Sequence, residues 1–126
     1  MTTTTTSAGA DSSPLISDAL FQALHMVETG GRLGPIKGDG GRALGPLQIH
    51  KVYWIDSGVP GRYEDCADLE YSKKVVRAYM ARYAVQRRLG RVPTDEDIAR
   101  LHNGGPNGHK KSATIPYWNK VKGYLK

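Results

Sequence analysis

Two carboxylates, Glu28 and Asp39, lie eleven residues apart at the start and in the middle of a glycine-rich stretch. Glu28 stands near the end of a predicted helix, and Asp39 lies in the turn sequence Lys37-Gly38-Asp39-Gly40-Gly41. Cleavage of a glycosidic bond needs such a pair. One carboxyl must be protonated to give a proton to the leaving oxygen, and the other must be ionised to stabilise or attack the oxocarbenium-like centre. Glycoside hydrolysis is therefore the leading hypothesis.

The two carboxylates are expected to lie in different environments. Glu28 follows Leu24 and Val27 in the last turn of its predicted helix, where partial burial and the negative end of the helix dipole favour the protonated form. Asp39 is flanked by glycines, so we expect it to be solvated, hydrogen-bonded to backbone amides and ionised. A purely structural interpretation stays open at this point, because Asp-Gly is first of all a turn signal.

The helix that carries Glu28 is well marked in the sequence. Ser17 is a predicted N-cap, and apolar residues recur at helical spacing from Leu20 to Val27. Gly30 and Gly31 then end the helix.

The segment that carries Asp39 is predicted to be a short, irregular β-hairpin over residues 32–44, because Asp39-Gly40 is a hairpin-turn dipeptide. Gly45-Pro46 predicts a second helix over residues 45–56, with proline at the first helical position. The other predicted elements are a long helix over 68–90, a short helix from the Thr94–Asp97 capping box through Leu101, a loop over 103–111, and a last helix capped by Thr114. The predicted fold class is α+β, mostly helical, with a small β-hairpin between the first two helices.

The 126-residue chain is long enough for one domain with a real core. The threonine-rich residues 1–13 are predicted to form a disordered tail, so the domain is expected over 14–126. The tail lacks the basic and apolar regions of a signal peptide. No apolar run approaches the roughly 20 residues of a membrane span, so membrane insertion is not expected.

The formal net charge of +6 suits a polyanion such as nucleic acid, an anionic membrane or an acidic glycan. No nucleic-acid motif accompanies it. The single cysteine, Cys66, cannot form an intramolecular disulfide. We expect no metal site and no cofactor, because His25 and Glu28 are two ligands on one helical turn with no third.

Several further residues are candidates for binding substrate. Gln48, His50 and Tyr53 follow the hairpin, where amides can bind acetamido groups and aromatic faces can pack on sugar rings. His102, Asn103 and Gly104 open a glycine-rich loop in which the backbone can approach a ligand closely. Core packing by Tyr53 and a left-handed helix cap at Asn103 are the structural alternatives.

Five motifs in order carry a resemblance to a known family. They are Gly45-Pro46-Leu47-Gln48-Ile49, Tyr53-Trp54-Ile55-Asp56, the tyrosine-rich residues 76–83, the segment 99–108 that includes His102-Asn103-Gly104-Gly105-Pro106, and Tyr117-Trp118-Asn119-Lys120-Val121. Together they resemble the invertebrate-type lysozyme family, which includes leech destabilase. The resemblance implies a lysozyme-like fold and muramidase activity, with Glu28 and Asp39 at the positions of that family's catalytic Glu and Asp.

The chain also departs from the family that it resembles. Family members are typically rich in disulfides, whereas this chain has one thiol. The segment after Asp39 looks one residue shorter than in animal members. Some members are credited with an isopeptidase activity that uses a serine in this segment, and residues 40–44 contain no serine, so we expect that activity to be absent.

The resemblance implies peptidoglycan and chitin oligomers as ligands, and we expect a monomer that is secreted or extracellular. Two other functions stay open. Glu28-Thr29-Gly30 also resembles the Glu-Ser-Gly motif of lytic transglycosylases, which use one acidic residue. A non-catalytic peptidoglycan-binding module is the second alternative, although such a protein would usually lose one carboxylate.

Overall fold

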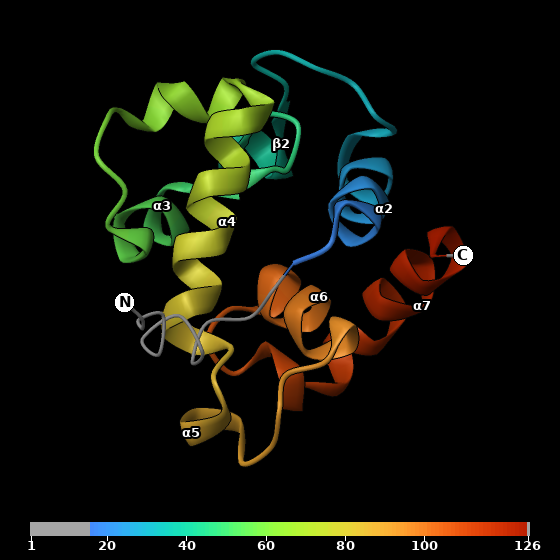
Figure 1. The fold of residues 1–126 in the computed structure, drawn as a ribbon. Coiled ribbons are helices and arrows are strands. Elements are labelled where there is room, and N and C mark those ends of the chain that lie inside the picture. The colour runs from blue at the N-terminus through green and yellow to red at the C-terminus, as the bar shows by residue number, and fades with distance from the viewer. Residues whose placement is uncertain (1–15, 126) are drawn as a thin grey trace, which may run out of the picture.

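The computed structural model describes residues 16–125 and shows a mostly helical α+β fold (Figure 1). The predicted tail over 1–13 lies outside the described residues. The helices are α2 (Asp18–Thr29), α3 (Lys51–Ser57), α4 (Leu69–Tyr83), α5 (Gln86–Leu89), α6 (Asp95–Gly104) and α7 (Ile115–Tyr124). Three two-residue strands, β2 (Lys37–Gly38), β3 (Ala43–Leu44) and β4 (Ile49–His50), form an antiparallel sheet in the order β2-β3-β4. The predicted fold class is confirmed.

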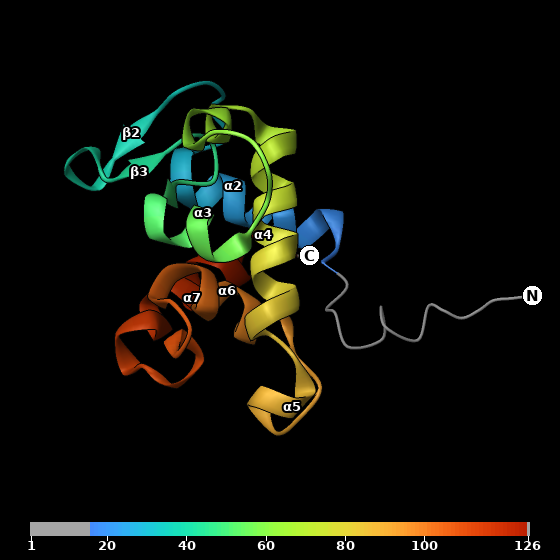
Figure 2. The same cartoon turned by 90° about the vertical axis from the view of Figure 1, so that its left-hand side faces the viewer.

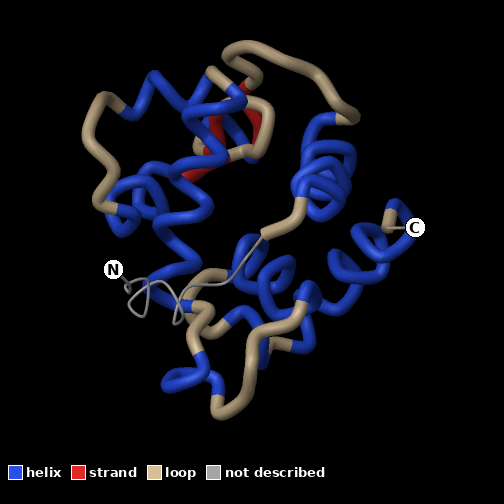
Figure 3. The backbone as a smooth tube through the Cα atoms, in the orientation of Figure 1, coloured by secondary structure: helices blue, strands red, loops and turns tan. Residues whose placement is uncertain are grey.

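Helix α4 has the small sheet near its N-terminal end, α3 alongside it and α6 near its C-terminal end (Figures 1 and 2). Its buried side chains pack with those of α2 in one core, to which β3, β4, α6 and α7 also contribute. The rings of Tyr53 and Tyr79 stack with their centroids 3.7 Å apart, which joins α3 to α4. Figure 3 shows that strands make up only a small part of the chain, so the sheet is a small local element in a mostly helical fold.

Helix α2 begins and ends where its sequence predicts. The Ser17 side chain accepts a hydrogen bond from the Leu20 amide at 3.0 Å, and Gly30 closes the helix with φ 68°, a left-handed conformation that glycine adopts without strain. Leu20, Phe21 and Leu24 are buried. The cap at Gly30 thus fixes the last turn, which carries Glu28, at the surface of the core.

The predicted helix over 45–56 is wrong in its first half. Residues 49–50 are strand β4, and α3 begins only at Lys51. Gly45 (φ 87°) and Gln48 (φ 54°) adopt left-handed conformations that no right-handed helix accommodates. The hairpin therefore continues into a third strand, paired to β3 through Ala43 with His50 and Leu44 with Ile49.

The predicted long helix over 68–90 is interrupted. The helix starts as predicted, because the Asp68 side chain caps it by accepting a hydrogen bond from the Tyr71 amide. It ends early, at Tyr83, because Ala84 has a non-helical ψ of 66°. Both Ala84 and Val85 are buried, and Arg88 Nη1 donates to the Tyr83 carbonyl that the break releases. Tertiary burial has overridden helix propensity here.

The capping box is confirmed, because Thr94 and Asp97 exchange side-chain to backbone hydrogen bonds at the start of α6. That helix runs on to Gly104, so the loop begins two residues later than the predicted start at 103. The loop contains a 3₁₀ turn over Gly108–Lys110. Thr114 precedes α7 but makes no capping bond. Its hydroxyl instead lies 2.7 Å from the Gly108 carbonyl and accepts from Arg100 Nε.

We expect the melting temperature to be the same with and without dithiothreitol. Cys66 is fully buried, and burial raises the pKa of its thiol to about 12, so the thiol is protonated and has little reactivity toward oxidants. Thermal melts monitored by circular dichroism check this. A marked drop in melting temperature on reduction would show that the thiol supports a cross-link between chains.

Candidate active site

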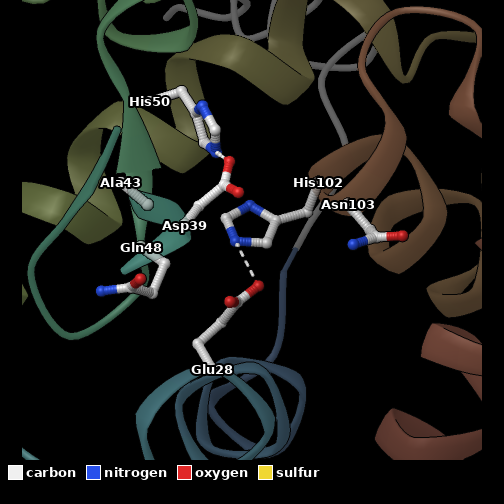
Figure 4. A pocket seen from close by; sticks show the side chains of 7 residues that line it. All are labelled: Glu28, Asp39, Ala43, Gln48, His50, His102 and Asn103. Carbon is white, nitrogen blue, oxygen red and sulfur yellow. Dashed lines mark ion pairs between the residues drawn. The ribbon is translucent and has the colours of Figure 1, made fainter. Parts of the chain in front are cut away.

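A pocket of about 260 Å³ brings the two carboxylates together (Figure 4). Glu28 reaches it from the end of α2, Asp39 from the 3₁₀ turn over Asp39–Gly41, and His102 from α6. The lining residues are Glu28, Asp39, Ala43, Gln48, His50, His102 and Asn103. Six of the eight predicted site residues therefore lie together in this pocket, and every lining side chain except that of Ala43 is polar or charged.

Glu28 is held firmly through one oxygen. The Tyr117 hydroxyl donates to Glu28 Oε2 at 2.6 Å, and His102 Nε2 lies 3.4 Å from the same oxygen. The Glu28 side chain is 17% exposed, so its carboxyl is largely screened from water but still reaches the pocket. This combination suits a group that must pass a proton to a bound ligand.

His102 is almost completely buried, with 2% of its side chain exposed. Tyr53 Oη lies 2.9 Å from Nδ1, and Nε2 lies 3.0 Å from the Leu47 carbonyl. A carbonyl only accepts, so Nε2 carries the hydrogen and Nδ1 accepts from the Tyr53 hydroxyl. Burial, more than the nearby Tyr79 and Glu28, raises the pKa of Tyr53 and keeps that hydroxyl protonated.

Asp39 lies in a contrasting environment. Its side chain is 52% exposed, Oδ2 lies 3.4 Å from His50 Nε2, and Oδ1 lies 3.5 Å from Arg42 Nη2. The expected solvation is present, but side chains rather than backbone amides surround the carboxylate. Asp39 has φ 52°, a left-handed conformation that Asp tolerates better than most residues. The turn therefore holds a solvated carboxylate beside the Arg42 guanidinium and the His50 imidazole.

Gln48 lines the pocket, but its amide group is already engaged. Nε2 donates to the carbonyls of Ile36 (3.1 Å) and Gly45 (2.9 Å), which ties β4 to the hairpin. Oε1 packs so closely on Gly38 that a Cβ added there would lie 2.0 Å away. Gln48 thus shapes the pocket wall, and its role in binding a sugar stays a prediction.

A second pocket of about 220 Å³ lies next to the first and shares His50, His102 and Asn103 with it. Tyr53 lines this one, together with Val52, Asp56, Tyr79, Gly105 and Pro106. Seven of the eight predicted site residues therefore line one or both of these two pockets. Gly104 lines neither, because it packs against Thr114 Cγ2. Asn103 lies within α6, and the residue that ends the helix is Gly105.

Tyr117 was not predicted from the sequence to be a site residue, although it contacts Glu28 in the structure. It lies 89 positions from Glu28, and α7 packs against α2 to bring them together. The only signal was its presence in the motif Tyr117-Trp118-Asn119-Lys120-Val121. Among residues 16–125, no three His, Cys, Asp or Glu side chains gather into a metal site, and no helix is both long and apolar enough to cross a membrane.

Comparison with known proteins gives a consistent result. The destabilase family model matches residues 19–123. "Lysozyme 1" of Crassostrea virginica is 39% identical over 91% of this chain, which spans only 63% of that relative's length. "Invertebrate-type lysozyme" of Ruditapes philippinarum is 38% identical over 97% of this chain and 92% of its own length.

Solved structures agree. The lysozyme in a crystal structure of Aeromonas hydrophila PliI in complex with Meretrix lusoria lysozyme superposes with TM-score 0.76 and 38% identity, over 86% of this chain and 89% of that one. Tapes japonica lysozyme gives TM-score 0.74 and 38% identity, over 87% of this chain and 92% of that one. The family model, the relatives and the fold all lead to one conclusion: this chain belongs to the destabilase family of invertebrate-type lysozymes.

Proposed function

We propose that the chain is a muramidase that hydrolyses the β-1,4 bond between N-acetylmuramic acid and N-acetylglucosamine in peptidoglycan. Its relatives are named lysozymes, which are glycoside hydrolases. The observation that carries the proposal is the presence of Glu28 and Asp39 in one pocket, in unlike environments. Glu28 is mostly buried and held by a hydroxyl, whereas Asp39 is half exposed beside Arg42 and His50.

The proposed roles follow from these environments. Glu28 gives its carboxyl proton to the glycosidic oxygen while the C1–O bond breaks and its electron pair leaves with that oxygen. Asp39 stabilises the positive charge that develops at C1, or bonds to C1, with its ionised carboxylate. A water molecule then adds to C1 and returns a proton to Glu28. The pocket needs no metal or cofactor for these steps.

The direct test is loss of turbidity in a suspension of bacterial cell walls, followed by mass spectrometry of the fragments. A hydrolase yields fragments that have gained one water molecule. Anhydro-sugar products would instead identify a lytic transglycosylase that uses Glu28 alone. Wall binding without any loss of turbidity would identify a non-catalytic module.

Lysis of whole cell walls is expected to weaken as salt is raised, whereas cleavage of short, uncharged chitin oligomers should change little. The motivating observation is the excess of 18 Lys and Arg over 12 Asp and Glu. This charge attracts an anionic wall, and salt screens exposed charges over about 8 Å at physiological ionic strength. Initial rates on both substrates across a salt series measure the effect. Parallel losses on both would mean that salt acts on the fold or the pocket.

We also propose that the protein acts outside the cell, where peptidoglycan is accessible, and that it is a monomer. Size-exclusion chromatography coupled to light scattering tests the monomer. We also retain the expectation that isopeptidase activity is absent.

A further inference from the structure

Two side chains, those of Tyr117 and His102, contact the Glu28 carboxyl at the same oxygen. The Tyr117 hydroxyl donates to Oε2 at 2.6 Å, and His102 Nε2 lies 3.4 Å from Oε2. Among the residues that the structure describes, no group hydrogen-bonds to Oε1. Figure 4 shows that second oxygen directed away from His102. The two oxygens of one carboxyl are therefore not equivalent.

We propose that Tyr117 is a positioning residue for Glu28, which anchors Oε2 and leaves Oε1 as the oxygen that carries the transferable proton. This inference rests on the proposed acid role of Glu28. A carboxyl that accepts at Oε2 can rotate little, so the proton on Oε1 keeps one direction in the pocket. When that proton leaves, negative charge spreads onto Oε2, where the Tyr117 hydroxyl already donates to it.

The surroundings of Tyr117 support this role. Burial raises the pKa of the Tyr117 phenol well above its ordinary value, and the charge of Glu28 and the hydrogen bond to it add to that effect. The phenol therefore keeps its proton throughout the pH range in which a carboxyl titrates. His102 is a weaker second contact, because its one Nε2 hydrogen is directed to the Leu47 carbonyl at 3.0 Å.

The first test is Tyr117→Phe, which removes the hydroxyl and keeps the ring. We expect kcat on cell walls to fall about ten- to a hundredfold, the range that corresponds to one hydrogen bond to a charged group. KM should change little. Without the donor the ionised carboxylate is less favoured, so the alkaline limb of the pH profile should move to higher pH.

Tyr124→Phe is the matched control, because Tyr124 is also on α7 but is 49% exposed. It should leave kcat, KM and the pH profile unchanged. A purely structural Tyr117 would lower the melting temperature of Tyr117→Phe without moving the alkaline limb. That result, or a kcat equal to that of the original protein, would overturn the proposal.

A second measurement does not depend on activity. Phenolate formation is followed by ultraviolet absorbance in the original protein, in Glu28→Gln, and in Glu28→Gln combined with Tyr117→Phe. Removing the Glu28 charge should let one tyrosine ionise at lower pH, and that transition should be missing in the double variant. No change in the titration would refute the anchoring contact. If the titrations behave as expected but the original protein does not lyse cell walls, the anchoring contact stands and the muramidase proposal is refuted.

Discussion

Glu28→Gln is expected to abolish cell-wall lysis, with a loss of about two to four orders of magnitude from the missing general acid alone. Glutamine has the same shape and can still accept from the Tyr117 hydroxyl through its amide oxygen. Its amide nitrogen then replaces the oxygen that would carry the proton, and an amide does not supply that proton at neutral pH. Turbidity loss and fragment analysis measure the effect.

The fold and the binding of glycan should survive this change, so melting temperature and co-sedimentation with walls should stay close to those of the original protein. Glu70→Gln is the matched control, because the Glu70 side chain is 74% exposed and forms an ion pair with Lys73 at the surface. It should keep full activity. A Glu28→Gln protein that lyses walls at nearly the original rate would remove the basis of the whole assignment.

The part of the site that could be predicted from the sequence is the part fixed by short-range interactions. Ser17 and Gly30 bound α2 and thereby place Glu28 in its last turn. Asp39-Gly40 was predicted in a hairpin turn, and residues 39–41 form the turn between β2 and β3. Each of these features depends on capping or turn chemistry within a few residues, which a single sequence contains.

What could not be predicted depends on contacts between distant segments. The bonds from Tyr117 to Glu28 and from Tyr53 to His102 span 89 and 49 residues. Neither has a local signal. The helix predicted from Gly45 failed for a related reason: the Gln48 side chain satisfies the carbonyl of Ile36 twelve positions away, which favours a left-handed conformation over a helical one. Hydrogen bonds between segments far apart in the sequence decided these positions.

Asp39→Asn is expected to slow hydrolysis about a hundred- to a thousandfold, the range seen when one electrostatic stabiliser of a transition state is removed. Asparagine tolerates the φ of 52° at this position about as well as aspartate does. The turn should therefore keep its shape, and the loss can be assigned to the missing negative charge. An alanine there would strain the backbone and confuse the two effects.

The products of Asp39→Asn distinguish the roles of the two carboxylates. Asp18→Asn serves as the control, because Asp18 is also exposed and lies at the far end of α2 from Glu28; it should be fully active. If Asp39 supports the charge at C1, the residual activity of Asp39→Asn should be low and its fragments should still contain added water. Full activity in Asp39→Asn would mean that Glu28 acts without a second carboxylate. Anhydro-sugar fragments from that active variant would then identify the transglycosylase reaction, in which one acidic residue is enough.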